Sequence, residues 1–338
     1  MIFVSGGTGL VGSHLLYYLI RSGEKIKALK RKNSDTSRVK YVFSLYDENP
    51  GQLYDKIQWV EGDVLDYFSL ENAIDEKDKV FHCAAIVSFH PSWHAQMMKV
   101  NVNGTSNLVN ACLQKKAEKL CFISSIAALG RNSDGEEIDE NTAWKTSRNN
   151  SAYAVSKYNA EREVWRGAAE GLKTVIVNPS VILGPGKWNI GSAQLFEQVW
   201  KGLRFYTNGI NGFVDVRDVG RIMIRLMESD IVNERFIVNA ENISYEFLFT
   251  EMAKALKKKP PNIRVNTLIS EIAWRIEKLK FYLTGKQPLI TKETARTANA
   301  RYYYSTQKLL NTIDYQYIPA RKSVRDTVEI FLNEHINQ

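Results

Sequence analysis

A tyrosine and a lysine separated by three residues form the strongest chemical signal in the sequence. They are Tyr153 and Lys157, in the segment Tyr-Ala-Val-Ser-Lys. Positions i and i+4 of a helix share one face, so the lysine ammonium is expected one turn from the phenol. A nearby cation stabilises a phenolate and lowers the tyrosine pKa from its usual value of about 10, toward the range that suits proton transfer. The spacing therefore predicts that Tyr153 is a general acid or base.

A glycine-rich turn at the start of the chain predicts a nucleotide site. The apolar run 2–4 is followed by glycines, and apolar residues then recur at helical spacing, which is typical of strand, turn and helix. Glycine allows the turn and the close approach of a pyrophosphate, and the helix N-terminus offers free N–H groups to that anion. We expect a dinucleotide to bind here, over Gly6, Thr8, Gly9, Leu10, Val11 and Gly12.

Basic residues after the second expected strand, 25–29, indicate which dinucleotide binds. Where an NAD-binding unit usually has an acid, this chain has Arg31 and Lys32, and no acid comes before Asp35. Arg31 can form a bidentate pair with a 2′-phosphate, which a carboxylate would repel. We therefore predict NADP(H) as the preferred cofactor, with NAD(H) as the alternative. A solvated basic turn is the other interpretation of the run.

Alternating apolar runs and helical patterns place these residues on one fold class. Strands are expected at 2–4, 25–29, 57–60, 80–83, 120–123, 174–177 and 235–238, with helices between them. This order predicts an α/β doubly wound parallel sheet, a Rossmann fold. We assign residues 1–178 and a return segment, 209–241, to the cofactor domain. Residues 179–208 and 242–338 form a smaller, mainly helical substrate domain.

Loops that follow parallel strands face the ligand crevice, and several of them carry candidate residues. Asp63, with Val64, follows the third strand and either meets the adenine or caps the next helix. Small residues, Ala84 and Ala85, follow the fourth strand and let a cofactor lie flat. Phe89 and Trp93 are candidate walls of a substrate pocket. The lone His82 in its apolar strand is interpreted as a core residue.

Composition limits the class of protein. The chain has 338 residues with a net charge of +8, but its cations are dispersed, so no nucleic-acid partner is expected. Three cysteines in apolar segments suggest reduced core residues, not a disulfide frame or a metal site. The expected strand at residue 2 leaves no room for a signal peptide, and no apolar run reaches a membrane-spanning length. We expect a cytoplasmic protein without bound metal.

An apolar stripe in the C-terminal part has two interpretations. Arginine and lysine residues lie beside it, and its members are Leu268, Ile272, Ile276, Leu279 and Leu283. A packing or lid helix of the substrate domain is favoured over a helix that lies on a membrane surface.

Motifs along most of the chain resemble the extended short-chain dehydrogenase/reductase superfamily, in its NAD-dependent epimerase/dehydratase family. Three motifs carry this resemblance: the glycines 6, 9 and 12, Ser125 with Gly130 five residues later, and Tyr153 with Lys157. Five further segments resemble the branch of dihydroflavonol reductases, 3β-hydroxysteroid dehydrogenases and cinnamoyl-CoA reductases: 82–85, 101–105, 124–130, 178–186 and 213–219.

The resemblance implies a role for each matched residue. Tyr153 would exchange a proton with a carbonyl or alcohol, and Lys157 would hold the nicotinamide ribose and bias Tyr153. Ser125 would hold the substrate oxygen, with Ser124 as the alternative. Asn178, Pro179 and Val181 would lie along the nicotinamide, Trp188 would border the substrate pocket, and a homodimer is expected.

Two enzyme classes and one binding function compete. A reductase or dehydrogenase of an apolar carbonyl or secondary alcohol is favoured for two reasons. The loop 89–93 is aromatic, and the stretch 209–212 lacks the arginine that sugar-nucleotide epimerases of this superfamily typically have there. A nucleotide-sugar epimerase or dehydratase is the second candidate, with Lys187, Lys201 and Arg204 as a phosphate clamp. A non-catalytic NADP(H)-sensing protein is the third.

Overall fold

The computed structural model describes residues 1–132, 135–147, 150–266, 269–272, 274–277 and 292–336. Its centre is a sheet of seven parallel strands in the order β11-β7-β5-β4-β1-β2-β3. The strands are β1 (Ile2–Ser5), β2 (Ile26–Lys30), β3 (Ile57–Glu61), β4 (Lys79–His82), β5 (Lys119–Ile123), β7 (Thr174–Pro179) and β11 (Glu234–Val238). All seven predicted strands are confirmed, and the predicted doubly wound sheet is observed.

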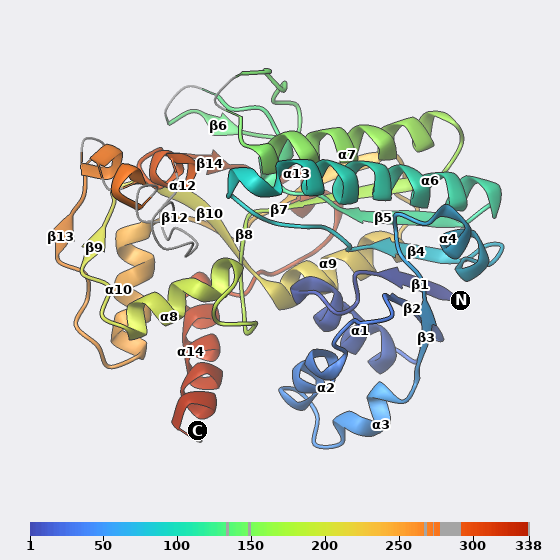
Figure 1. The fold of residues 1–338 in the computed structure, drawn as a ribbon, viewed down its shortest axis with the longest axis horizontal. Helices are drawn as coiled ribbons and strands as arrows, with labels where there is room; N and C mark the ends of the chain where they lie inside the picture. The colour runs from blue at the N-terminus through green and yellow to red at the C-terminus, as the bar shows by residue number, and fades with distance from the viewer. Residues whose placement is uncertain (133–134, 148–149, 267–268, 273, 278–291, 337–338) are drawn as a thin grey trace.

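Helices cover both faces of this sheet, which is why its strands are apolar on both sides. In Figure 1, α6 and α7 lie above the sheet, and α1 and α9 lie below it. Each layer encloses its own apolar cluster against the sheet. The helices of this part are α1 (Leu10–Arg21), α2 (Ser37–Ser44), α3 (Pro50–Tyr54), α4 (Tyr67–Ala73), α5 (His94–Met97), α6 (Gly104–Gln114), α7 (Ala152–Ala169) and α9 (Val216–Glu228).

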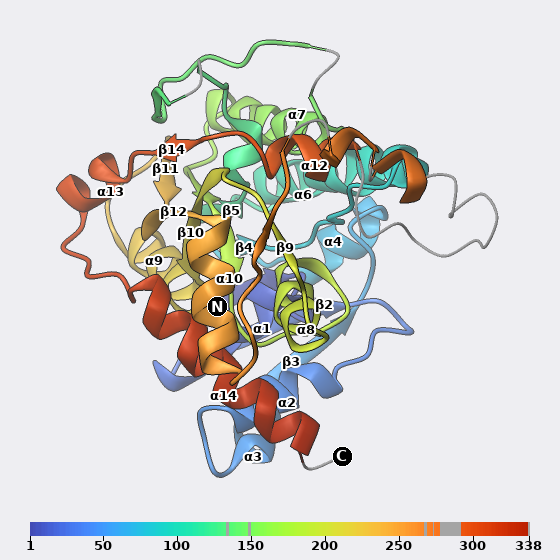
Figure 2. The same ribbon diagram turned by 90° about the vertical axis from the view of Figure 1, so that its left-hand side faces the viewer.

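A third apolar cluster organises the C-terminal part, which faces the viewer in Figure 2. Its helices are α8 (Gln194–Trp200), α10 (Tyr245–Ala255), α12 (Lys292–Thr297), α13 (Gln307–Thr312) and α14 (Ala320–Ile336). Small sheets join its segments: β8 (Val181–Leu183), β10 (Ile210–Asp215) and β12 (Glu241–Ser244); β9 (Phe205–Tyr206) and β13 (Ile263–Arg264); β6 (Glu137–Ile138) and β14 (Tyr303–Tyr304). Phe196 and Val199 are fully buried in this cluster.

The segment 209–241, assigned to the cofactor domain, contributes to two sheets. Its strand β10 pairs with β8 and β12 outside the main sheet, and β11 joins the main sheet beside β7. The division into domains stays a prediction. A π-helical stretch, Met98–Asn103, lies between α5 and α6. The buried Asn101 lies in this wide turn, and its amide bonds both backbone groups of Ile86.

The apolar stripe near the C-terminal part is described only in part. Residues 269–272 and 274–277 are helical, and the side chains of Ile272 and Ile276 are exposed. Leu268, Leu279 and Leu283 lie outside the described residues. Within the part of the chain that the structure describes, no helix combines the length and apolarity needed to cross a bilayer.

Candidate active site

The carboxyl ends of four neighbouring strands collect the predicted site residues at one edge of the sheet. Gly6 follows β1, Ala84 follows β4, Ser125 follows β5, and Asn178 lies near the end of β7. These strands are adjacent in the order β1, β4, β5 and β7. From β1 the chain adds β2 and β3 on one side and then β4, β5 and β7 on the other, so the strand order reverses between β1 and β4. In open α/β sheets such a switch point is where ligands bind.

The glycine turn has the geometry of a pyrophosphate cradle. Gly6 has φ +73°, and a Cβ there would lie 2.4 Å from the backbone nitrogen of Ala84. A Cβ on Gly12 would lie 2.2 Å from the carbonyl oxygen of Gly6. No side chain caps the start of α1 at Leu10, so its first N–H groups face the exposed turn at Gly9. The turn therefore fits a dinucleotide.

An arginine that sequence reasoning missed lies beside this turn. Arg38, in the first turn of α2, is half-buried, and burial lowers its pKa. Its Nε has no hydrogen-bond partner among the described residues, and its Nη2 is the nearest neighbour to the Cβ position of Gly186, at 2.9 Å. Arg31 and Lys32 are exposed just after β2. The sequence did contain a signal for Arg38, because this second arginine follows Arg31 by only one short loop.

The remaining predicted cofactor residues lie around the same crevice. Asp63 accepts a hydrogen bond from the Leu65 backbone N–H at 2.9 Å, so it at least caps its own turn, and Val64 is buried. The Oδ1 of Asn178 is buried without a hydrogen-bond partner within the described chain, as is the Ser180 hydroxyl. Such acceptors and donors are costly unless a ligand completes them, so this strand end also fits a bound cofactor.

The structure corrects the prediction for the pKa of Tyr153. The residue lies in the first turn of α7, partly exposed, and its ring meets Phe89 edge to face at 5.9 Å. Burial raises its pKa above the usual value, and a hydrogen bond with Ser125 opposes that rise only in part. The predicted lowering is wrong for this state, because the loss of hydration on burial outweighs the opposing effect of Ser125.

Lys157 is held below Tyr153 by contacts that the spacing alone did not predict. Its side chain is fully buried, and Nζ donates a hydrogen bond to the Ile123 carbonyl at 2.8 Å. The ammonium also lies 4.3 Å from the centre of the Phe122 ring. Burial lowers the pKa of Lys157 to about 8, and the negative charge of Glu161 opposes that change. A lysine with this pKa can change its charge near neutral pH.

The two adjacent serines have different environments. Ser125 is partly exposed at the crevice, and its hydroxyl oxygen accepts a hydrogen bond from the Ala127 N–H at 3.1 Å. Ser124 is buried and donates to Glu161 at 2.7 Å. Because Ser124 is committed to an internal carboxylate, Ser125 is the better placed to contact a substrate. Glu161 is a buried site residue that sequence reasoning missed.

His82 is the core residue that the sequence indicated. Its ring bonds the Ser5 hydroxyl at 2.6 Å and the Thr105 hydroxyl at 3.0 Å. Burial lowers the pKa of His82 to about 3, so it is neutral and links β1 to α6. Asn101 lies nearby in the π-helical turn and donates to Ser156 at 3.0 Å, next to Lys157.

The three predicted pocket aromatics are not brought together. Phe89 contacts Tyr153, and Trp93 is exposed at the end of the same loop. Trp188 instead packs against Phe196 and Phe331, and its indole N–H donates to Glu334 of α14 at 2.8 Å. Trp188 thus belongs to the core of the C-terminal part in this structure, and no described contact joins it to Tyr153.

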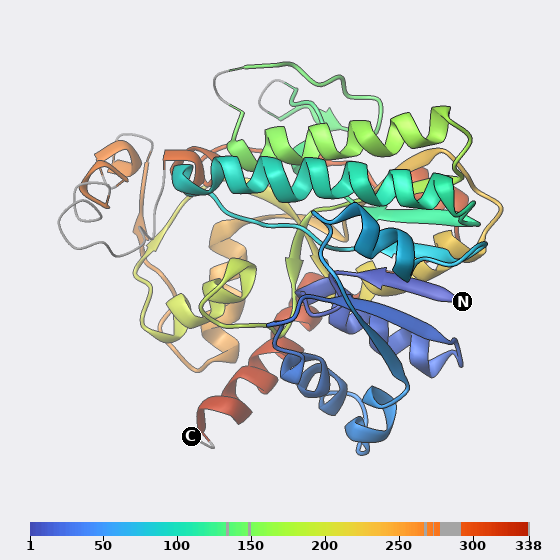
Figure 3. The ribbon, with the colours of Figure 1, turned by 45° about the vertical axis from the view of Figure 1, so that its right-hand side comes forward.

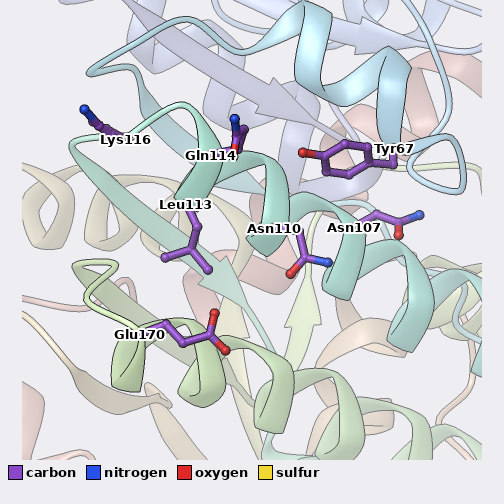
Figure 4. A pocket seen from close by; sticks show the side chains of 7 residues that line it. All are labelled: Tyr67, Asn107, Asn110, Leu113, Gln114, Lys116 and Glu170. Carbon is purple, nitrogen blue, oxygen red and sulfur yellow. The ribbon is translucent and has the colours of Figure 1, made fainter.

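A hollow of about 880 Å³ lies away from these residues, over α4, α6 and the end of α7 (Figure 4). Its lining is Tyr67, Asn107, Asn110, Leu113, Gln114, Lys116 and Glu170. Small-molecule sites are mainly apolar, whereas this lining is mostly polar, so the strand-end crevice is the better candidate. The described residues contain no cluster of three or more histidine, cysteine or acidic side chains able to hold a metal ion.

Comparisons with known proteins agree with this geometry. Residues 2–239 match the NAD dependent epimerase/dehydratase family. The chain is 27% identical to cinnamoyl-CoA reductase 1 of Petunia hybrida, over 95% of each chain. It is 29% identical, over 98% of this chain and 94% of the relative, to a Synechocystis sp. protein provisionally named dihydroflavonol 4-reductase.

Solved structures extend the comparison to the fold. The crystal structure of gox2253 has a TM-score of 0.82 and 28% identity, over 99% of this chain and 98% of the other. The UDP-glucose 4-epimerase of Thermotoga maritima has a TM-score of 0.77 at 19% identity, over 99% of each chain, a likeness of fold alone. The chain belongs to the NAD-dependent epimerase/dehydratase family, within the extended short-chain dehydrogenase/reductases, and is an NAD(P)-dependent oxidoreductase.

Proposed function

We propose that this oxidoreductase transfers hydride between NADP(H) and the carbonyl or secondary alcohol of a mainly apolar small molecule. The observation that carries the proposal is the arrangement of Ser125, Tyr153 and Lys157 at the end of β5. The Ser125 side chain lies close enough to the Tyr153 phenol to lower its pKa at the partly exposed crevice, and Phe89 supplies an apolar wall beside the phenol. The reductase names of the relatives support the same class.

The residues divide the chemistry between them. In reduction, Ser125 donates a hydrogen bond to the carbonyl oxygen and places it beside the Tyr153 hydroxyl. Tyr153 gives its proton to that oxygen as negative charge develops, and the ammonium of Lys157 stabilises the phenolate left behind. The bound nicotinamide supplies or accepts the hydride. In oxidation, Tyr153 removes the proton from the alcohol.

Preference for NADP(H) follows from the cations beside the glycine turn. Arg31 is exposed at the end of β2, and Arg38 presents an Nε without a described partner. The first acid after β2, Asp35, accepts hydrogen bonds from the backbone and hydroxyl of Ser37. A 2′-phosphate would therefore meet two guanidinium groups. A homodimer and a cytoplasmic location stay predictions from the sequence.

A nucleotide-sugar epimerase or dehydratase is the second candidate, because epimerases share the fold over the whole chain. One proposed clamp residue, Lys201, already pairs with Glu197 at 2.6 Å, which weakens this alternative. A panel of aldehydes, ketones and nucleotide sugars, with NADPH present, distinguishes the two. The proposal predicts one alcohol released for each NADPH consumed. Product formation without net change of the cofactor would indicate an epimerase, and no turnover on any substrate would favour the NADP(H)-sensing alternative.

Tyr153→Phe tests the assignment of the proton donor. The variant keeps the ring and its contact with Phe89 but lacks the hydroxyl, so turnover should fall by a factor of roughly 10² to 10⁴. NADPH binding, measured by fluorescence, should persist. Activity close to that of the parent protein would remove Tyr153 from the mechanism.

A further inference from the structure

A buried carboxylate lies directly behind the proposed catalytic residues. Glu161 follows Lys157 by four residues and Tyr153 by eight, so all three share one face of α7. Its residue exposure is only 2%. An isolated carboxylate in such a place would be very unfavourable, so its partners must satisfy it.

Glu161 accepts hydrogen bonds from three strands and from its own helix. Oε2 accepts from the Ser124 hydroxyl of β5's end at 2.7 Å and from the Asn178 amide of β7 at 2.9 Å. Oε1 accepts from Arg235 of β11 at 2.9 Å and from the Trp165 indole at 3.4 Å. A carboxylate has about four acceptor sites, and all are used here.

Two of these donors lead to the reacting residues. The Asn178 amide also donates to the backbone carbonyl of Ser125 at 3.0 Å, and Ser124 is the neighbour of Ser125 in the chain. Glu161 therefore fixes the end of β5 from both sides of the Ser124–Ser125 peptide. Displacing the carboxylate would release the backbone that carries the Ser125 hydroxyl.

The charge of Glu161 also acts on Lys157. The Lys157 ammonium donates to a backbone carbonyl and has no ion pair among the described residues. The titratable groups around Lys157 are Glu161 and Tyr153 on α7, His82 at the end of β4, and Cys83, which follows that strand. Arg235 pairs with Oε1 of Glu161 at 2.9 Å and partly neutralises it.

We propose that Glu161 is a positioning residue, which orients Ser125 through Ser124 and Asn178 and stabilises the charged form of Lys157. Because Arg235 pairs with Glu161, it limits how strongly the carboxylate stabilises the Lys157 ammonium. The inference depends on the proposed function, since it concerns the charge of the same lysine. It adds a residue that touches neither substrate nor cofactor.

Two substitutions, which remove charges of opposite sign, test the proposal. Glu161→Gln keeps the side-chain size but removes the charge, so Lys157 should lose its proton at a lower pH. The alkaline limb of the kcat/KM profile for reduction should move down by about one pH unit. Arg235→Gln leaves the carboxylate less neutralised and should move that limb up. Glu163→Gln is the matched control, because Glu163 lies on the same helix and pairs with the surface residue Arg166.

Stability of the protein without cofactor gives a readout that needs no turnover. The pKa of Lys157 is about 8 when folded and higher when unfolded, so the unfolded chain binds more protons above pH 8. The free energy of unfolding, taken relative to Lys157→Met, should therefore rise with pH above that value. In Glu161→Gln the rise should begin about one pH unit lower.

A downward shift of the alkaline limb in Glu161→Gln and an upward shift in Arg235→Gln would support the inference. Equal losses of kcat in both variants with unshifted limbs would overturn it and leave Glu161 a purely structural residue. If Glu161→Gln does not fold, the upward shift in Arg235→Gln decides alone. Failure of the parent protein to reduce any carbonyl would refute the proposed function instead, and the stability measurement would still decide the link between Glu161 and Lys157.

Discussion

Substitution of Gly12 by alanine tests the cofactor turn more directly than any other change. The added Cβ would lie 2.2 Å from the Gly6 carbonyl oxygen, 2.8 Å from its carbon and 2.9 Å from the Gly7 Cα. These are backbone atoms, so no side chain can rotate away. Ordinary contact begins near 3.4 Å, and the turn must retreat by about 1 Å.

The displacement has two measurable costs. Overpacking of this size costs roughly 1–3 kcal/mol of unfolding free energy, offset by up to about 1 kcal/mol from the better helix former. The retreat also breaks the alignment of Gly6 and Gly9, because the Gly9 N–H donates a hydrogen bond to the Gly6 carbonyl at 2.9 Å. We expect the dissociation constant of NADPH to rise at least tenfold, which corresponds to about 1.4 kcal/mol.

Chemical denaturation and NADPH fluorescence titration measure the two effects, and two other glycines calibrate them. A Cβ on Gly9 would have one contact, at 3.2 Å from the Gly6 oxygen, so Gly9→Ala should be milder in stability. A Cβ on Gly51 in α3 would meet nothing within 4 Å, so Gly51→Ala should be neutral or slightly stabilising. If Gly12→Ala binds NADPH as tightly as Gly51→Ala, the pyrophosphate site has been placed wrongly.

Three further predictions concern other parts of the site. Ser125→Ala should lower kcat by roughly 10² to 10³, as loss of one donor to a developing oxyanion does. Ser124→Ala should mainly lower the free energy of unfolding. Steady-state kinetics and denaturation would separate the two effects, and the reverse pattern would exchange the roles of the two serines. Arg38→Ala should weaken NADPH about tenfold and leave NADH unchanged, measured by titration; equal losses would exclude a 2′-phosphate contact. The folded pKa of His82 is about 3 against 6.5 unfolded, so the unfolding free energy should fall as pH drops below 6.5, and His82→Gln should show a shallower fall.

The central sheet could be predicted from sequence because each strand is buried on both faces and reads as a short apolar run. Strands such as β9 and β13 could not, because each has two residues and pairs with a segment more than fifty positions away. The π-helical turn was also missed, since Asn101 leaves the helical pattern only to bond the Ile86 backbone. Local periodicity contains neither of these distant partners.

The site was predictable where chemistry depends on residue spacing, and less so where it depends on burial. Tyr153, Lys157 and the glycines were found because their spacing is fixed by one helix or one turn. The raised pKa of Tyr153 and the buried carboxylate of Glu161 result from packing between α7 and three strands. Trp188 packs with the core of the C-terminal part, and an aromatic residue after a strand fits a pocket wall and a core equally well, so its place in the substrate pocket stays a prediction.

The π-helical stretch Met98–Asn103 gives the chain a particular sensitivity to changes in length (Figure 3 shows α6 and α7 packed side by side beyond it). A π-turn holds one more residue than an α-turn, so deleting a single residue here would restore a regular helix. The helical backbone would be unstrained, yet α5 and the loop before it would rotate by about 100° relative to α6. Asn101 would then lose Ile86, and the loop bearing Phe89 would swing away from the phenol. Natural variation within this family should therefore tolerate substitutions in the stretch far better than one-residue gaps.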